Sequence, residues 1–445
     1  MTIQEFGAKL RAGTVTSEAI VEQCLTRIEA RNPATNAFIL VMGDEARRQA
    51  READHELAAG RDRGPLHGVP LSIKDLMDVR GTETTAASRV RVGRVASQDA
   101  PCVASLRAGG AVFVGKTNLH EYALGTTSSD SAFGAVRHPL DPTRSPGGSS
   151  GGSAVSVATG MALASVGTDT GGSIRIPAAC CGIVGLKPSL RDVSTEGVIP
   201  LSSTFDHVGP IAASVSDAWT VLRVLTGDLA PPPLAPAAAS ALRIAVPRPY
   251  FLDMLDDDVR ARFEASLETF RAAGIRVREI GIPHTETIAN VYIRISLKEA
   301  AAYHTATLDA VPERYTPPVR QRLEMGRHIP HDEYMLALGA REQLRRDVDA
   351  AFADCDALAL PTLPIPAPKI GAEMVQVGPT EQPLRNVMLR LTQLFNITGH
   401  PAISVPCGLT REGLPCGLQL VGAQGRTREL VQAALACEAA IGSRV

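Results

Sequence analysis

Residues 145–188 read SPGGSSGGSAVSVATGMALASVGTDTGGSIRIPAACCGIVGLKP, and the rest of the chain is best interpreted around this stretch. It contains two glycine-rich turns, at 147–152 and 171–172, where the backbone can bend or be approached closely. The small residues of 153–163 predict a tightly packed helix, and 164–166 predicts a short buried strand. The serines beside the two turns are therefore expected on loops that rigid elements hold in place.

A lone lysine follows a short apolar run upstream of this stretch. Leu71–Ile73 is predicted to be a strand, and Lys74 stands at its end. Burial of an amine in such a place lowers its pKa, because the charged form loses its hydration. Lys74 could therefore be neutral and act as a base.

The second glycine-rich turn, Thr170-Gly171-Gly172-Ser173, could serve a reaction or only reverse the chain. Successive backbone N–H groups in such a turn can point at one spot and stabilise a developing negative charge. Because Ser173 directly follows the two glycines, we favour an oxyanion hole made by these four residues.

Strands and helices alternate along the first half of the chain. Strands at 71–73 and 111–114, with a helix at 102–108 between them, are typical of an α/β layer protein. The proline-rich stretch at 229–240 predicts a linker, because consecutive prolines cannot lie inside a helix or a central strand.

A new α/β unit is expected after the linker, with helices that form a side lobe. Its predicted elements are strands at 242–246 and 275–280, a helix at 256–273, and helical segments at 288–309 and 332–353. Four tyrosines of this lobe either shape the entrance to the site or lie on a solvated helix surface. They are Tyr292, Tyr303, Tyr315 and Tyr334.

Composition limits the partners that the chain can be expected to bind. The 45 Lys and Arg residues nearly balance the 47 Asp and Glu residues, for a formal net charge of −2. No global field therefore attracts nucleic acid or an anionic membrane, so we expect a small-molecule substrate, no nucleic acid and no membrane.

The cysteines and the N-terminus indicate the compartment. The eight cysteines show no CxxC spacing, which favours buried free thiols in a reducing environment and no metal site. Neither a signal peptide nor a run of 18 apolar residues is present, so a cytoplasmic location is expected. No cofactor is predicted.

Two short motifs suggest other chemistries and are not favoured. Residues 110–117, GAVFVGKT, match a phosphate-binding loop, but the variable residues of the match are themselves a predicted strand. The GxSxG pattern in 147–152 follows Ser145-Pro146, a poor strand end for a nucleophile elbow. The histidines that such a hydrolase would need downstream lie in no recognisable context.

Several motifs in one order resemble the amidase signature family of serine hydrolases, from Gly64 to about Gly422. The motifs are GPLHGVPLSIKD at 64–75, GKTNLHEYALGTTSSDSAFG at 115–134, the central stretch, PAISVPCG at 401–408 and PCGLQLVG at 415–422. The resemblance implies an α/β fold with a large mixed, mostly parallel central sheet, helices on both faces and a smaller helical side lobe. It also implies a single domain over residues 1–445, with a core at 60–228 and 355–445, a linker near 229–240 and a lobe at about 241–354.

The resemblance implies roles for particular residues. Lys74, Ser149 and Ser173 match the catalytic triad, with a cis peptide bond before Ser149. The supporting residues are Ser150, Asp169 and Arg175, although a buried Asp169–Arg175 ion pair is a structural alternative to substrate contact. The loop that carries Ala123, Gly125 and Thr126 is expected to line the acyl pocket. Homodimers are common in the family.

The implied activity is cleavage of amide C–N bonds in small or medium organic molecules through an acyl-enzyme on Ser173. Aryl esters and carbamates (urethanes) are further possible substrates. The alternative is the glutamine-hydrolysing amidase subunit of a tRNA-dependent amidotransferase. That subunit needs groups for the glutamine α-carboxylate and α-amine, and no such pair stands out in residues 290–400. A catalytically silent binding protein is a third interpretation, which the intact set of Lys74, Ser149 and Ser173 disfavours.

Overall fold

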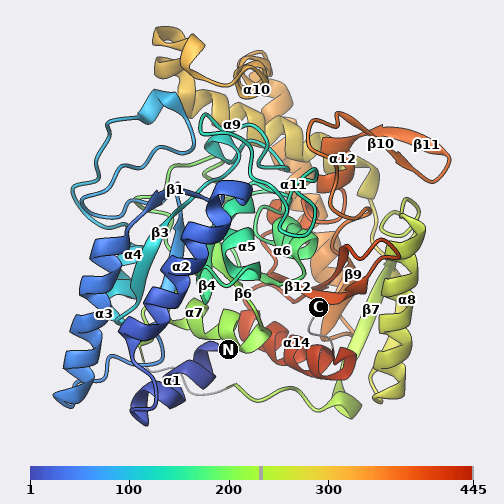
Figure 1. The fold of residues 1–445 in the computed structure, drawn as a ribbon. Coiled ribbons are helices and arrows are strands. Elements are labelled where there is room, and N and C mark those ends of the chain that lie inside the picture. Colours follow the sequence, from blue (N-terminus) through green and yellow to red (C-terminus); the bar gives the residue numbers. More distant parts are fainter. Residues whose placement is uncertain (230–233, 443–445) are drawn as a thin grey trace.

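The protein is built on one large central sheet (Figure 1). The computed structural model describes residues 1–229 and 234–442, so part of the predicted linker lies outside the described residues. The sheet has 11 strands in the order β1-β3-β2-β4-β6-β5-β12-β13-β9-β7-β8. A separate two-stranded sheet is formed by β10 and β11.

The strands have the following bounds. They are β1 Phe38–Val41, β2 Pro70–Lys74, β3 Val112–Thr117, β4 Ala164–Asp169, β5 Val184–Lys187, β6 His207–Ala212, β7 Arg243–Arg248, β8 Arg276–Gly281, β9 Ala357–Pro361, β10 Met374–Val377, β11 Thr380–Pro383, β12 Ala402–Leu409 and β13 Pro415–Val421.

The α-helices have the following bounds. They are α1 Ile3–Arg11, α2 Ser17–Thr35, α3 Gly43–Ala58, α4 Pro101–Ala108, α5 Gly151–Ala158, α6 Arg175–Cys181, α7 Val215–Leu225, α8 Asp257–Ala272, α9 Ile288–Ala310, α10 Pro317–Arg327, α11 His331–Ala351, α12 Leu384–Leu389, α13 Leu394–Ile397 and α14 Thr427–Ile441.

The predicted α/β class with a large mixed sheet is confirmed, but the sheet is not mostly parallel. Parallel pairs are β2–β3, β2–β4, β7–β8 and β7–β9. The other neighbours in the large sheet are antiparallel: β1 pairs with β3 at one edge, and every pair from β4 to β9 is antiparallel. The reason is local in part: β12 and β13 are joined by a short connection, which forces them to run in opposite directions.

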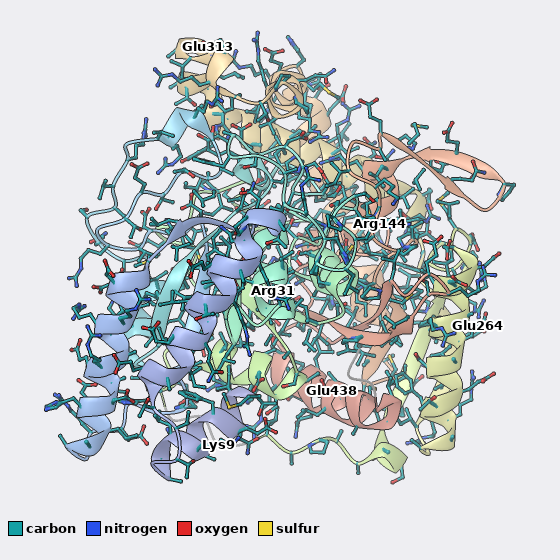
Figure 2. All side chains as sticks on the ribbon, in the orientation of Figure 1. Lys9, Arg31, Arg144, Glu264, Glu313 and Glu438 are labelled. Atoms are coloured by element: carbon teal, nitrogen blue, oxygen red, sulfur yellow. The ribbon has the colours of Figure 1, made fainter. Side chains whose placement is uncertain are left out.

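Helices cover both faces of the sheet. Every residue of β2, β3, β4 and β9 is buried. Because successive side chains of a strand point to opposite faces, complete burial requires cover on both sides. Charged side chains project from the outer helices instead, as Figure 2 shows for Lys9 on α1 and Glu264 on α8.

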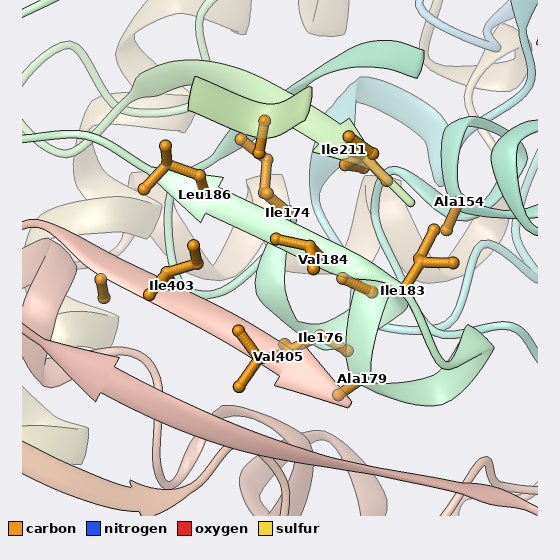
Figure 3. Close-up of a cluster of buried hydrophobic side chains, with 14 of the residues drawn as sticks. Ala154, Ile174, Ile176, Ala179, Ile183, Val184, Leu186, Ile211, Ile403 and Val405 are labelled. Atoms are coloured by element: carbon orange, nitrogen blue, oxygen red, sulfur yellow. The ribbon is translucent and has the colours of Figure 1, made fainter. Parts of the chain in front are cut away.

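An apolar cluster fixes the short helix α6 against the middle of the sheet. Figure 3 shows Ile174 and Ile176 close to side chains of β5 and β12, among them Val184 and Val405. These isoleucines flank Arg175, so apolar packing on both sides sets the position of the arginine.

The segment after the linker both extends the sheet and builds the side lobe. β7 and β8 form one edge of the large sheet, beside β9. α9 packs against α10 and α11, and these helices lie at the top and right of the molecule in Figure 1. No helix among residues 1–229 and 234–442 combines the length and apolar character needed to span a membrane. The eight cysteines are free and buried, as predicted.

Candidate active site

Lys74 ends β2 inside the protein and contacts two hydroxyl groups. Its side chain is fully buried, and Nζ donates hydrogen bonds to Ser149 Oγ at 2.9 Å and to Thr168 Oγ1 at 2.7 Å. Strand β2 sets the position of the amine, because Lys74 is the last residue of this strand and Leu71 and Ile73 of the same strand are buried. Two of the residues expected in the triad therefore meet.

The surroundings of Lys74 keep its amine close to neutrality. Burial lowers the pKa of Lys74 from its ordinary value to about 7, although the negative charges of Asp169 and Asp206 raise it. An ammonium loses more hydration on burial than an amine does, and that loss is the dominant effect here. Near pH 7 the amine can therefore accept a proton from Ser149.

Ser149 lies on the glycine-rich loop that precedes α5. The peptide bond between Gly148 and Ser149 is cis, as the family resemblance implied. The carbonyl of Ser149 accepts hydrogen bonds from His120 N at 3.1 Å and Ser128 Oγ at 3.0 Å. A Cβ at Gly148 would lie only 2.7 Å from Ser128 N, so the close approach of the two loops requires glycine.

Ser173 follows the second glycine-rich turn and is linked to the first loop. Its carbonyl accepts a hydrogen bond from Ser150 N at 3.2 Å, and Ser150 Oγ donates to Thr168 O at 3.2 Å. The predicted supporting residue Ser150 thus ties the Ser173 loop to the strand that carries Thr168. Ser173 is 5% exposed, so it is buried but not completely enclosed.

The turn before Ser173 is held from two sides. Thr170 Oγ1 donates to Asp206 Oδ1 at 2.5 Å, and Thr392 Oγ1 donates to the carbonyl of Gly171 at 2.6 Å. In a trans peptide the N–H points away from the C=O. The N–H of Gly172 is therefore directed away from Thr392, and Gly172 adopts φ +137°, a conformation that favours glycine. Such a turn can present N–H groups to an oxyanion.

Asp169 and Arg175 form a buried ion pair beneath this turn. Both side chains are fully buried, with Arg175 Nη2 2.9 Å from Asp169 Oδ1. Burial alone would raise the pKa of Asp169, but Arg175 holds it below its ordinary value. Asp169 Oδ2 also accepts from Ile174 N at 3.1 Å. The pair therefore supports the backbone around Ser173 from below, in line with the structural alternative stated for it.

The remaining donors of Arg175 reach distant parts of the sequence. Its Nη1 donates to Gln419 Oε1 at 2.6 Å and to Thr392 O at 3.1 Å, and its Nη2 donates to Asn396 Oδ1 at 2.7 Å. Asn396 Nδ2 returns a hydrogen bond to Asp169 Oδ1 at 2.8 Å. A buried charge that is satisfied in this way is strongly oriented.

The predicted acyl-pocket loop is buried and closely packed. Ala123 and Thr126 are each at most 5% exposed, and Ala123 has φ +58°. A Cβ at Gly125 would overlap the ring of His120, so this position also requires glycine. Whether the loop contacts substrate stays a prediction.

One of the four lobe tyrosines reaches the site. A side chain at Gly171 would collide with Tyr292 Oη, which places that hydroxyl beside the turn before Ser173. Tyr292 is 3% exposed, and burial raises its pKa to about 12. Tyr303 is 46% exposed and belongs to the solvated surface. Tyr315 packs beside Tyr122, with ring centroids 5.6 Å apart.

Neither disfavoured motif has the surroundings that its pattern requires. Gly115, Lys116 and Thr117 lie within β3, and Lys116 Nζ is 2.6 Å from Asp75 Oδ1 in a buried ion pair. The GxSxG serine Ser149 pairs with Lys74, whereas His207 Nδ1 lies 2.7 Å from the carbonyl oxygen of Phe205.

Sequence reasoning missed a set of polar residues around the predicted triad. They are Thr168, Asp206, Thr392, Asn396 and Gln419. Gln419 was part of the quoted motif PCGLQLVG, so its polar side chain in an otherwise apolar strand was a usable signal. The others carry no local pattern.

A buried lysine that donates to a serine, with a second serine on a glycine-rich turn bonded to the same loop, is the arrangement expected of a serine hydrolase whose base is lysine. Comparison with known proteins gives the family. The family model described as Amidase matches residues 19–431, and the chain belongs to this amidase (amidase signature) family, whose members act on carbon–nitrogen bonds.

Individual relatives cover nearly the whole chain. A glutamyl-tRNA(Gln) amidotransferase subunit of Roseiflexus castenholzii is 40% identical over 95% of this chain and 92% of its own length. A crystal structure of an amidase superposes with a TM-score of 0.93 at 40% identity, covering 99% of both chains. The peptide amidase of Stenotrophomonas maltophilia gives a TM-score of 0.85 at 29% identity, covering 100% of this chain and 98% of its own.

The first of these relatives corrects the prediction that excluded nucleic acid. Full-length relatives are named as subunits of an amidotransferase for glutamyl-tRNA(Gln), so the prediction of no nucleic-acid partner is wrong. The error lies in the use of net charge. A formal charge of −2 averages over the whole chain and does not describe the charge of any one surface.

Proposed function

We propose that this protein hydrolyses the C–N bond of a small carboxamide through an acyl-enzyme on Ser173 and releases ammonia. The observation that carries the proposal is the 2.9 Å hydrogen bond from buried Lys74 Nζ to Ser149 Oγ. A serine hydroxyl is a weak nucleophile until a base removes its proton. An amine whose pKa is about 7 is a suitable base at neutral pH.

The proposed steps use the roles that the family resemblance implies for Lys74, Ser149 and Ser173. Ser173 Oγ attacks the carbonyl carbon while its proton passes to Ser149, whose own proton passes to Lys74. The turn at Thr170–Ser173 stabilises the oxyanion. The C–N bond then breaks, and the leaving nitrogen takes the proton back along the same route. Water attacks the acyl-enzyme in the same way, so that one amide and one water give one carboxylic acid and one ammonia.

L-Glutamine is the first substrate to consider, with the ammonia passed to partner subunits of a tRNA-dependent amidotransferase. The support for this version is similarity: relatives with that name align over nearly all of both chains. Glutamine is also a small primary carboxamide, which the mechanism requires.

A second candidate function is hydrolysis without partner subunits, on organic amides and on aryl esters or carbamates. The observation that favours it is the structural similarity to an amidase at a TM-score of 0.93 over 99% of both chains. The acyl-enzyme route accommodates these leaving groups because the protein acts on the carbonyl.

Purified protein can be assayed for ammonia release from L-glutamine, and for hydrolysis of an acyl nitroanilide, the matched carbamate and the matched ester. Ser173→Ala should abolish turnover and labelling by a fluorophosphonate, while Ser240→Ala, at an exposed position, should change neither. Turnover that persists in Ser173→Ala would reject the proposal. Glutaminase activity that appears only with partner subunits would favour the amidotransferase, and nitroanilide hydrolysis by the chain alone would favour the second candidate.

A further inference from the structure

A pocket with two arginines lies beside the candidate active site. Its volume is about 560 Å³, and its lining includes Arg191, Arg341 and Asp206. Asp206 connects the pocket to the site, because its Oδ1 accepts the hydrogen bond from Thr170 Oγ1. The lining contains no residue of the predicted triad, so the proposed hydrolysis leaves this pocket without a role.

Arg341 is held in the wall of the pocket without an ion pair. It lies on α11, is partly buried, and has its guanidinium carbon 5.0 Å from the ring centroid of Phe205. Nε donates to Ile397 O at 2.8 Å and Nη2 to Thr204 O at 3.1 Å, and in the described part of the chain no carboxylate pairs with Arg341. Neutral carbonyls orient the guanidinium and leave its charge available to an anion.

Arg191 has a backbone conformation that favours glycine. Its φ is +71°, in the left-handed region, where a Cβ is unfavourable. The residues on both sides are fixed by backbone hydrogen bonds, from Leu190 N to Gly399 O at 3.0 Å and from Asp192 N to Ser189 O at 3.1 Å. Glycine would suit this backbone better, so an arginine here points to a use for its side chain.

The two arginines are close enough for their charges to interact. Burial lowers the pKa of Arg341, the charges of Glu342 and Glu299 oppose that effect, and the charge of Arg191 adds to it. An anion placed between the two guanidiniums would relieve their repulsion and accept hydrogen bonds from both.

The carboxylates of the lining are not placed to serve as that anion. Asp206 Oδ2 accepts from the backbone N–H groups of Leu201 at 2.9 Å and Ser202 at 3.1 Å, and Glu196 is exposed. Other lining residues carry hydroxyl groups, which can also donate to an oxyanion. They are Ser194, Thr195, Ser203 and Thr204.

We propose that this pocket binds the phosphate group of a small ligand between Arg191 and Arg341. A planar guanidinium can donate to two phosphate oxygens at once. The volume of about 560 Å³ is in the range of pockets for small organic ligands. Inorganic phosphate and an organic phosphate such as a nucleoside monophosphate share this chemistry. The inference does not depend on hydrolysis at Ser173, because binding requires no turnover.

The direct test is calorimetric titration of the full chain with inorganic phosphate, with the ionic strength held constant by sodium chloride. Wild type should bind phosphate saturably. Arg341→Met and Arg191→Gly should each raise the Kd by about tenfold or more, because a hydrogen bond to a charged group is lost. The same titration with AMP distinguishes the two sources: tighter binding of AMP than of phosphate indicates an organic ligand, and equal or weaker binding indicates free phosphate.

The matched control is Arg345→Met, which removes another arginine of α11, one that is paired with Glu342. It should bind phosphate as wild type does. Wild type without saturable binding of phosphate or AMP would overturn the inference. So would an unchanged Kd in both Arg191→Gly and Arg341→Met, because the phosphate would then bind elsewhere.

Arg191→Gly has a second readout in its free energy of unfolding. Glycine accepts the left-handed conformation, so the variant should be at least as stable as wild type in a denaturant titration while its phosphate binding is weakened. A clear loss of stability would show that Arg191 serves folding and would count against a ligand site.

Discussion

Lys74 Nζ and Ser149 Oγ are joined by a 2.9 Å hydrogen bond in a fully buried part of the protein. The contact connects the charge of the lysine to the reactivity of the serines. In the proposed reaction an ammonium at Lys74 could not accept the proton from Ser149, so turnover should depend on the fraction of neutral amine.

The first prediction concerns pH. Because burial lowers the pKa of Lys74 to about 7, kcat/KM should fall about tenfold per pH unit below that value and level off above it. A pH–rate profile from about pH 5.5 to about pH 9 on an uncharged amide measures this limb. A flat profile across that range would contradict the assignment of Lys74 as the base.

The second prediction concerns Asp206, whose negative charge raises the pKa of Lys74. Asp206→Asn removes that charge, so the acidic limb of the profile should move to lower pH. Asp253→Asn, at an exposed position, should leave the limb where it is. A shift of the limb to higher pH in Asp206→Asn would show that the charge acts in another way.

The third prediction concerns the nucleophile turn. Gly171→Ala forces a methyl group against Tyr292 Oη, so the turn must move and its N–H groups lose their alignment. We expect kcat to fall about 100- to 1000-fold, the usual effect of losing one oxyanion donor. Gly339→Ala is the matched control, because Gly339 lies in α11 with nothing near its Cβ position. Partial recovery in Gly171→Ala with Tyr292→Phe would confirm that the collision is the cause.

The fourth prediction concerns the ion pair beneath the site. Arg175→Met leaves Asp169 buried and unpaired, so the free energy of unfolding should drop by about 3 to 5 kcal/mol. Arg243→Met breaks the exposed pair with Asp356 and should produce a much smaller loss in the same denaturant titration. Similar losses for both variants would mean that burial does not set the strength of these pairs.

Local sequence was sufficient to predict the elements that carry the central serines. The strand before Lys74 and the strand at Ala164 were both expected, because short apolar runs beside glycine have few alternatives. The helix expected over 153–163 spans Gly151–Ala158 and so ends earlier. Gly160, with φ +68°, explains why it cannot continue.

Strand direction and the outer part of the site could not be predicted in this way. Whether β6 runs parallel or antiparallel to β4 depends on how the chain returns across the sheet, which no local pattern records. Thr392 and Asn396 lie in no motif, and only the folded structure shows that they contact Gly171 and Asp169.

The hydrogen bond between Arg175 and Gln419 spans 244 residues of sequence. A ribosome makes the two serine loops long before it makes the side chains that fasten Arg175 in place. During synthesis, Arg175 therefore lacks its later hydrogen-bond partner Gln419 until the strand at Pro415–Val421 has been made. A truncated chain that ends before this strand should depend on chaperones and show no activity, even though it contains every proposed catalytic residue.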